Sequence, residues 1–417
     1  MLPAARAGGG HAPFVTALFT AASAVCVTGL AVVDTPTYWS VFGQVLLTVL
    51  SQIGGFGIMT MATLLSLLVS RRLGMRSRLM AQAESAGLFG GNVGGVLIRV
   101  AAVMLASETV ISVVLTLRFW LTYHYSFGRA VWEAVFHAVQ AFNNAGFALY
   151  SDSLVRFVGD AWICVPLALG VLGGSIGFPV LFELAREWRT PGSWSTHARL
   201  TVWGTVLLSG IGFLVFLTFE WSNPRTLGPL SVPTKLLAAF TQDVMTRSGG
   251  FNSIDLGGMN TETIAVTNAM MFIGGGSAST AGGIKVTTFL LLAFVIWAEI
   301  RGEPDVVIRT RRIAEATQRQ AITVALLGVA LVASGTVLLI ALTHEVPFDR
   351  ALFEVTSAFA TVGLSTGITP TLPPSAQIVL VVLMYVGRVG TISVGTAIAL
   401  NTRRRSYRYA EERPLVG

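Results

Sequence analysis

Charged residues are scarce in this sequence. Asp, Glu, Lys and Arg make up 12% of its 417 residues, whereas apolar residues make up 53%. Soluble domains carry about a quarter charged residues. The composition therefore excludes an ordinary soluble globular protein, although the length alone would suit two or three soluble domains.

Residues that carry catalytic or redox chemistry are equally sparse. The two cysteines, Cys26 and Cys164, have neither metal nor redox spacing and provide no disulfide framework. The histidines His124, His137 and His344 show no ligand spacing, and we interpret them as polar interface residues. The sequence contains no Walker, HExxH or paired-carboxylate arrangement. We therefore expect no enzyme activity, no covalent cofactor and no transition metal, and nucleotides would act only through a partner protein.

Long uncharged runs decide the class instead. Four of them cover residues 41–70, 161–182, 200–219 and 321–343, which are 30, 22, 20 and 23 positions. A helix of about 18–20 apolar residues is long enough to cross a bilayer. The sequence thus predicts an all-α polytopic membrane protein.

Arginines mark the ends of these runs. Seventeen of the 26 arginines fall in four blocks, at residues 71–78, 186–199, 301–319 and 403–413. Cytoplasmic loops of membrane proteins collect basic residues, so we expect all four blocks on the cytoplasmic side of a cell membrane. The net charge of +7 then reflects topology and contact with membrane lipids, and we expect no nucleic-acid partner.

A short pattern recurs four times along the chain. Each copy ends in a glycine followed by a large apolar residue: Val27-Thr28-Gly29-Leu30, Asn144-Ala145-Gly146-Phe147, Ser248-Gly249-Gly250-Phe251 and Thr361-Val362-Gly363-Leu364. The glycines are 117, 104 and 113 residues apart. Such near-even spacing indicates an internal repeat of roughly 110 residues.

The surroundings of the four tetrapeptides are also alike. An apolar stretch too short to span a membrane precedes each one, at residues 12–25, 129–142, 232–245 and 347–360, and a polar turn and a long apolar segment follow. Each unit therefore consists of a spanning helix, a short re-entrant helix, an extended loop and a second spanning helix. We expect four pseudo-symmetric helix–pore loop–helix repeats around one central ion pore, at residues 1–80, 81–195, 196–312 and 313–402, with a basic cytoplasmic tail at 403–417.

The first repeat differs from the others. Only Met1 to Ala12 precede its re-entrant segment, and these residues are too few to span a membrane. We therefore expect repeat 1 to lack its first spanning helix, either because the start of the chain is truncated or misassigned or because that helix is absent.

Four extended loops at membrane depth need polar surroundings, because unpaired backbone groups are costly in lipid. Carbonyl groups from converging loops can replace the water shell of a cation, and the C-terminal ends of the short helices favour a positive charge there. The alternative is that the glycines serve helix packing. We predict a selectivity filter formed by three residues of each loop: Val27, Thr28, Gly29, Asn144, Ala145, Gly146, Ser248, Gly249, Gly250, Thr361, Val362 and Gly363.

The chain resembles the Trk/Ktr/HKT superfamily of potassium transporters, most closely its KtrB-type members, over nearly its whole length. Besides the four loops, the matching residues are Gln52-Ile53-Gly54-Gly55-Phe56-Gly57-Ile58-Met59-Thr60, Ala141-Phe142-Asn143 and Thr246-Arg247. The resemblance implies potassium uptake across a bacterial inner membrane, with K+ bound at the filter residues, Na+ as an activator, a homodimer, and a cytosolic KtrA-type nucleotide-binding ring as regulator. In some plant members a serine replaces the first filter glycine and accompanies sodium preference, so Gly29 favours potassium. A sodium-selective or non-selective transporter of the same fold is the alternative.

A second glycine-rich segment lies where the last helix of the third repeat is expected. Residues 274–283 contain five glycines, two serines and a threonine, and each glycine weakens a helix by about 1 kcal/mol relative to alanine. A phosphate-binding loop is excluded because Ile284 separates Gly283 from Lys285, whereas small-residue helix packing stays open. The resemblance implies an intramembrane gating loop, 272–285, beneath the filter. Its gate residues are Gly274, Gly275, Gly276, Ser277, Ala278, Ser279, Thr280, Ala281, Gly282, Gly283 and Lys285.

Two further charged residues lie inside apolar spans. Charged groups within the membrane are costly and usually functional. The resemblance implies that Arg388 faces the pore below the filter and belongs to the gate, against the alternative that it snorkels to an interface. For Glu108 we favour a helix–helix hydrogen bond or a charge pair over a direct function.

Overall fold

The computed structural model describes residues 2–72 and 93–390. Three of its helices, α5 (Val93–Leu121), α9 (Thr196–Glu220) and α13 (Glu315–Thr343), contain segments long and apolar enough to cross a membrane. A bent pair, α7 (Ala161–Ile176) and α8 (Phe178–Glu187), qualifies when it is counted as one span. The expectation of a mostly helical chain with several apolar helices is confirmed.

Four short helices occupy the stretches predicted to be re-entrant. They are α1 (Phe14–Val25), α6 (Phe127–Phe142), α10 (Val232–Met245) and α14 (Phe348–Phe359). Serine or proline occupies the N-cap position of each one, and no side-chain capping hydrogen bond forms at any of the four. Helices of 12 to 16 residues are about 18–24 Å long and cannot cross a hydrocarbon layer of about 30 Å.

The helices that follow the loops are less regular. α3 (Val41–Arg72) runs for 32 residues, but α7 ends at Ile176, just before Gly177 with its φ of 92°, and α8 continues at 105° to α7. The run 161–182, which the sequence presents as one span, is therefore broken. Gly177 has a backbone conformation that helices cannot contain, and Pro179 suits the first turn of a new helix.

The third and fourth units are interrupted as well. α11 (Thr261–Phe272) and α12 (Val286–Ile300) are separated by the glycine-rich segment, as the weak helix propensity there indicates. α15 (Pro374–Tyr385) continues into a π-helical turn, Val386–Gly390, that contains Arg388. Such turns occur frequently at functional sites.

The described residues also include several short helices, strands and turns. A short helix, α2 (Thr35–Tyr38), precedes α3, and an antiparallel pair of two-residue strands, β1 (Val307–Ile308) and β2 (Arg311–Arg312), follows α12. The 3-10 turns are at Pro3–Ala5, Val155–Phe157, Leu256–Gly258 and Thr369–Thr371. Between Leu2 and α1 there is no α-helix; the turn there lies on the start of α3, where Ser40 Oγ donates to Ala4 O at 2.6 Å.

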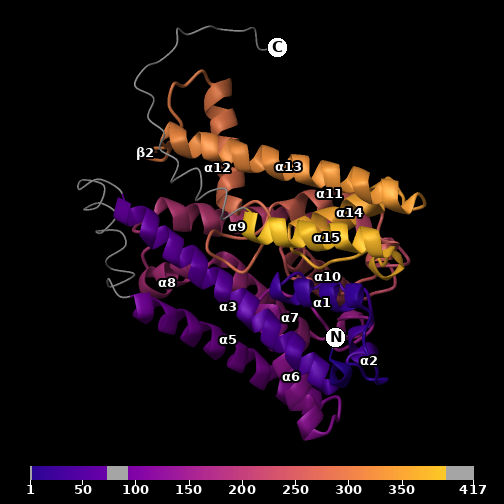
Figure 1. The fold of residues 1–417 in the computed structure, drawn as a ribbon. Coiled ribbons are helices and arrows are strands. Elements are labelled where there is room, and N and C mark those ends of the chain that lie inside the picture. The colour runs from indigo at the N-terminus through magenta and orange to yellow at the C-terminus, as the bar shows by residue number, and fades with distance from the viewer. Residues whose placement is uncertain (1, 73–92, 391–417) are drawn as a thin grey trace.

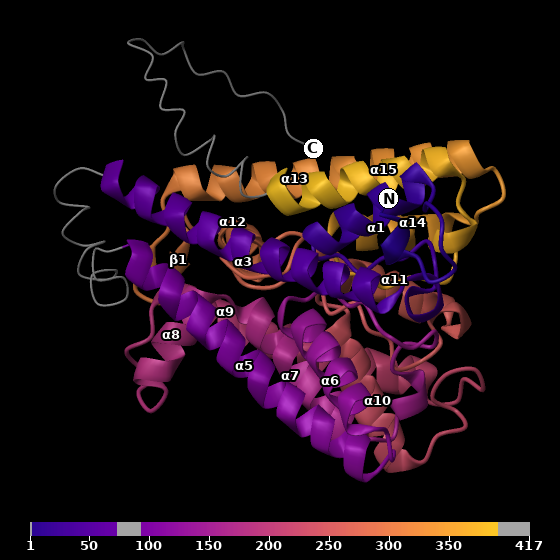
Figure 2. The same cartoon turned by 60° about the horizontal axis from the view of Figure 1, so that its bottom comes forward.

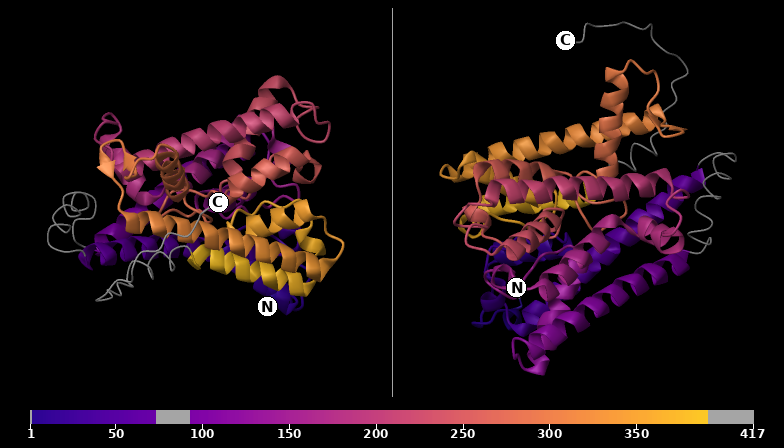
Figure 3. Two further views of the ribbon diagram at one scale, coloured as in Figure 1. Left: turned by 90° about the horizontal axis from the view of Figure 1, so that it is seen from above. Right: turned by 180° about the vertical axis from the view of Figure 1, so that it is seen from behind.

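The packing partners of the long helices recur along the chain. α5 packs on α6 and α7, α9 on α10 and α11, and α13 on α14 and α15, while α1 packs on both α3 and α15. An early helix and a late helix of the chain therefore contact each other, as Figure 1 and Figure 2 show for α1 and α15. Buried apolar clusters lie within these groups, one among α5, α6 and α7 and another among α1, α13, α14 and α15. Figure 3 shows α13 and α15 side by side.

Parts of the predicted repeat boundaries lie outside the described residues. These are the junction of repeats 1 and 2 near residue 80, the end of repeat 4 at 391–402, and the basic tail at 403–417.

Gly54 provides a test of the packing of α3 on α1. A Cβ at Gly54 would stand 2.0 Å from the carbonyl oxygen of Val25, so Gly54→Ala must displace the end of α1. We expect the melting temperature of the detergent-purified protein to fall by several degrees, as overpacking does in close-packed interiors. Gly57→Ala on the same helix is the control, because no atom lies within 4 Å of its new Cβ. Equal melting temperatures of the two variants would contradict this packing.

Candidate functional site

The four glycine loops share one backbone conformation. The residue two positions before the glycine and the glycine itself both have positive φ. The angles are 55° at Val27, 62° at Asn144, 69° at Ser248 and 48° at Thr361, and 93° at Gly29, 69° at Gly146, 74° at Gly250 and 91° at Gly363. A positive φ is a genuine outlier for the β-branched Val27 and Thr361. Strained residues of this kind cluster at functional sites, so the repeated outlier indicates one structural motif used four times.

The N–H groups of the loops are bonded back to the short helices. In three loops the middle residue, Thr28, Ala145 or Val362, donates to the carbonyl five residues earlier at 2.8 Å. The hydroxyls of Ser23 and Ser357 also accept from the N–H groups of Gly29 and Gly363, at 3.0 and 3.1 Å. With these donors used, carbonyl oxygens are the main backbone groups that such loops can offer to a ligand.

The structure brings the four loops together. Neighbouring loops approach so closely that an added Cβ at any of the four glycines would clash with the next loop. The distances from such a Cβ are 2.0 Å from Gly29 to Ala145 O, 2.4 Å from Gly146 to Gly250 Cα, 2.9 Å from Gly250 to Val362 O and 2.1 Å from Gly363 to Thr28 O. Each loop contacts the next and the fourth contacts the first, so the predicted filter residues of all four loops lie in one cluster.

Side chains of the short helices brace the loops after the glycines, and the sequence analysis did not identify them. Glu354 of α14 is fully buried and accepts three hydrogen bonds from the segment that follows the fourth loop. Its donors are Ser365 Oγ, Thr366 N at 3.2 Å and Thr369 Oγ1 at 2.9 Å. The presence of an acidic residue on a short apolar helix is the feature of the sequence that could have identified Glu354.

The predicted gate residues form a loop folded back on itself. Gly274 N donates to Ile284 O at 2.8 Å, which pairs the two ends of the segment. Gly276 N donates to Ser175 O at 2.7 Å at the end of α7. The segment is therefore an ordered loop, and the alternative of an intact helix packed through small residues is wrong.

This loop lies directly against three of the four glycine loops. Thr280 Oγ1 donates to Asn144 Oδ1 at 2.8 Å, and Gly282 N donates to Ser248 Oγ at 3.2 Å. An added Cβ at Gly282 would stand 2.2 Å from Thr361 Oγ1. The positive-φ residues of loops two, three and four thus all face the glycine-rich segment, whereas Val27 of the first loop is apolar.

Two cationic side chains hold the glycine-rich loop from its other side. Lys285 Nζ donates to Ala281 O at 2.5 Å, and Arg388 Nη1 donates to Thr280 O. Arg388 is 3% exposed, so its guanidinium does not reach a membrane interface and the alternative of snorkelling is wrong. The predicted gate residues at 274–283, Lys285 and Arg388 are brought together.

The remaining predicted polar residues have local partners. Glu108 accepts hydrogen bonds from Gln52 Nε2 at 3.1 Å and Asn143 Nδ2 at 3.0 Å, which confirms a helix–helix hydrogen bond. His137 Nδ1 lies 2.6 Å from Glu133 O, and its Nε2 accepts from Leu149 N at 3.3 Å. Within the described ranges, no group of three or more His, Cys, Asp or Glu side chains could hold a metal ion.

Comparison with known proteins gives the class of the molecule. Residues 5–407 match the family described as TrkH, cation transport protein. The chain belongs to this family of membrane cation transporters, and the resemblance found in the sequence is confirmed.

Individual relatives cover nearly the whole chain. Ktr system potassium uptake protein B of Bacillus subtilis is 39% identical over 97% of this chain and 90% of its own length. The protein of the same name in Vibrio alginolyticus is 35% identical over 96% and 88%. Potassium/sodium uptake protein NtpJ of Enterococcus hirae is 32% identical over 100% and 92%. The crystal structure of the potassium transporter TrkH from Vibrio parahaemolyticus shares the fold, with a TM-score of 0.68, 19% identity and coverage of 94% of this chain and 79% of that one.

The buried carboxylate of Glu354 allows a test of the loop bracing. Glu354→Ala leaves three donors without their acceptor, and an unsatisfied buried polar group costs about 1–3 kcal/mol. We expect a clear fall in the melting temperature of the purified protein. The exposed Glu345 precedes the same helix, and Glu345→Ala should change the melting temperature little. A Glu354→Ala variant as stable as Glu345→Ala would contradict the bracing role.

Proposed function

We propose that this chain takes up potassium ions across a bacterial inner membrane, through a selectivity filter made by the four glycine loops. The observation that carries the proposal is the closed ring of contacts among loops that share one strained backbone conformation. The names of the most similar relatives, which are potassium uptake proteins, support the choice of ion.

The electrostatics of the loop cluster favour a cation. The short helices α1, α6, α10 and α14 all end at the loops, and the C-terminal end of a helix carries a partial negative charge. Carbonyl oxygens can substitute for the hydration shell of K+. Filter occupancy by K+ therefore needs no acidic side chain.

The four units would form one pore with pseudo-fourfold symmetry. The recurring packing of α5, α9 and α13 on their short helices supports repeats at 81–195, 196–312 and 313–402, and α1 with α3 supplies the corresponding part of repeat 1. In this arrangement the filter glycines come from four equivalent positions along one chain.

The glycine-rich loop, 272–285, would act as the gate. It contacts loops two, three and four at once, and Lys285 and Arg388 donate to its carbonyls. Opening then requires the loop to leave these partners together. Glycines suit such a movement because their backbone adopts conformations that other residues rarely reach.

The same proposal includes the orientation of the transporter in the membrane and its partner proteins. The end of α3, the turn after α8 and the strand pair β1–β2 carry arginines and lie toward one end of the molecule (Figure 2), which supports a single cytoplasmic face. We propose a homodimer that binds a cytosolic KtrA-type nucleotide-binding ring there, so that nucleotides act only through this regulator. Na+ would act as an activator of uptake.

Gly250→Ser tests the filter. The substitution adds a side chain at φ 74° and puts a Cβ 2.7 Å from Gly146 Cα, so we expect it to disrupt the loop cluster. The wild-type chain should restore growth of a potassium-uptake-deficient bacterium at low potassium, and Gly250→Ser should abolish it. Gly210→Ser on α9, with no atom within 4 Å of the new Cβ, is the control. Rescue that is indifferent to Gly250→Ser counts against the filter, and Na+ competition during uptake distinguishes a sodium-selective relative.

Arg388→Gln tests the gate. It removes the positive charge and weakens the bond to Thr280 O, so we expect K+ flux through proteoliposomes without any regulator to rise several-fold. The matched control is Arg225→Gln, because Arg225 is an exposed arginine away from the glycine-rich loop. Unchanged or reduced flux through folded Arg388→Gln protein would contradict the gate.

A further inference from the structure

The residue three positions before each filter glycine differs in chemistry from loop to loop. These residues are Cys26, Asn143, Arg247 and Ala360. Two of them, Asn143 and Arg247, are polar, fully or nearly fully buried, and bonded to other helices. Arg247 Nη1 donates to Thr205 O of α9 at 3.0 Å. The second and third loops are therefore tied outward at this position.

Asn143 is the centre of a compact hydrogen-bond network. Its Nδ2 donates to Gln52 Oε1 of α3 at 2.8 Å, to Glu108 Oε1 of α5 at 3.0 Å and to Val139 O of its own helix at 2.9 Å. The next residue, Asn144, is already a filter residue. A shift of the Asn143 side chain therefore moves the start of the second loop directly.

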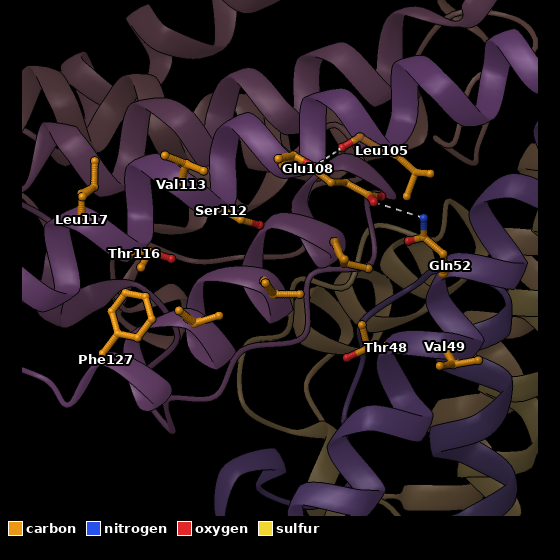
Figure 4. Close-up of a pocket in the computed structure, with 14 residues that line it drawn as sticks. Thr48, Val49, Gln52, Leu105, Glu108, Ser112, Val113, Thr116, Leu117 and Phe127 are labelled. Atoms are coloured by element: carbon orange, nitrogen blue, oxygen red, sulfur yellow. Dashed lines mark hydrogen bonds between the residues drawn. The ribbon is translucent and has the colours of Figure 1, made fainter.

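Glu108 closes this network with its second oxygen. Gln52 Nε2 donates to Glu108 Oε2 at 3.1 Å (Figure 4). The carboxylate therefore receives one amide from α3 and one, that of Asn143, from the end of α6. Glu108 is 5% exposed. Hydrogen bonds from neutral donors to a carboxylate are stronger than those between neutral groups, and in surroundings of low polarity their loss is costly. We call Glu108, Gln52 and Asn143 the amide–carboxylate clamp.

The far side of the second loop is fixed independently. Asn144 Nδ2 donates to Ser175 Oγ at 2.6 Å, and its Oδ1 accepts from Thr280 of the glycine-rich loop. Ala145 O in turn lies against Gly29 of the first loop. The clamp thus supplies the outer of two anchors that hold the carbonyls of loop two in the cluster.

We propose that Glu108 is a positioning residue for ion discrimination, acting through Asn143 and Gln52 on the second filter loop. The proposal rests on the filter function proposed above. The number and arrangement of the backbone carbonyls around an ion contribute to discrimination between cations. Without the carboxylate, Asn143 and Gln52 lose their shared acceptor and the second loop can relax outward.

The surroundings of Glu108 make it a clean position to change. It lines a cavity of about 610 Å³ between α3, α5 and α6, whose wall also includes Thr109 and Ser112 (Figure 4). Substitution at 108 therefore alters the clamp without forcing atoms into a packed core. The next residue, Thr109, provides the matched control. In the described part of the chain, its hydroxyl donates only to Leu105 O of its own helix.

The experiment compares Glu108→Ala, Glu108→Gln and Thr109→Ala in K+ uptake with Na+ as competitor. We expect the preference of Glu108→Ala for K+ over Na+ to fall about tenfold. This is the change in an equilibrium constant that the loss of one hydrogen bond to a charged group produces. Glu108→Gln keeps one of the two oxygen acceptors and replaces the other with an NH2 group, so it should retain an intermediate preference, and Thr109→Ala should retain all of it. A merely structural role would lower the amount of folded protein but leave the preference of the surviving protein unchanged.

A double variant identifies the route. If Glu108 acts through Asn143, Glu108→Ala combined with Asn143→Ala should change ion preference no more than the larger single change, because residues in one network are not additive. Full additivity overturns the clamp. An unchanged preference in Glu108→Ala overturns it as well.

Failure of the transport proposal is recognised separately. If the wild-type chain takes up no K+, the filter function is wrong. The clamp is then tested on purified protein, by comparing the melting temperature in K+ with that in choline. A ligand that binds the folded state raises this temperature. A smaller increase in Glu108→Ala than in Thr109→Ala supports the clamp. Equal increases in the two variants, or no increase in any of the proteins, overturn it.

Discussion

Irregular backbone inside an apolar helical protein must find a partner for each of its polar groups, because neither water nor lipid supplies one. Here the irregular segments satisfy one another. The glycine loops bond back to their short helices, contact their neighbours, and receive the glycine-rich loop, 272–285, through Thr280 and Gly282. Removal of any one segment would leave buried backbone groups of the others without their partners.

A shared backbone does not mean shared side-chain chemistry. The first and fourth loops are braced by the equivalent serines Ser23 and Ser357, whereas the second and third are tied outward through Asn143 and Arg247. The side-chain hydrogen bonds between the glycine loops and the glycine-rich loop involve Asn144 and Ser248 of the second and third loops. The equivalent residue of the first loop, Val27, has an apolar side chain. One repeated backbone motif therefore carries different side-chain contacts in each copy.

The sequence predicted those features that are encoded locally and repeatedly. Four glycine motifs at even spacing, the short stretches before them and the concentrated glycines at 274–283 were all visible. The clamp was not, because Gln52 and Asn143 are 91 residues apart and nothing local indicates that they meet. The bend at Gly177 was missed for a different reason: an uninterrupted apolar run conceals a break that only one backbone angle produces.

Ser248 connects the proposed filter to the proposed gate. Its hydroxyl donates to Thr361 O of the fourth loop at 2.7 Å and accepts from Gly282 N of the glycine-rich loop at 3.2 Å. If the glycine-rich loop moves away, the hydroxyl loses its donor and its bond to a filter carbonyl changes, because hydrogen bonds in a chain polarise one another. If the glycine loops bind an ion as proposed, its occupancy and the position of the glycine-rich loop would be linked through this oxygen atom, and by reciprocity an ion that alters the Thr361 carbonyl would also alter the stability of the glycine-rich loop.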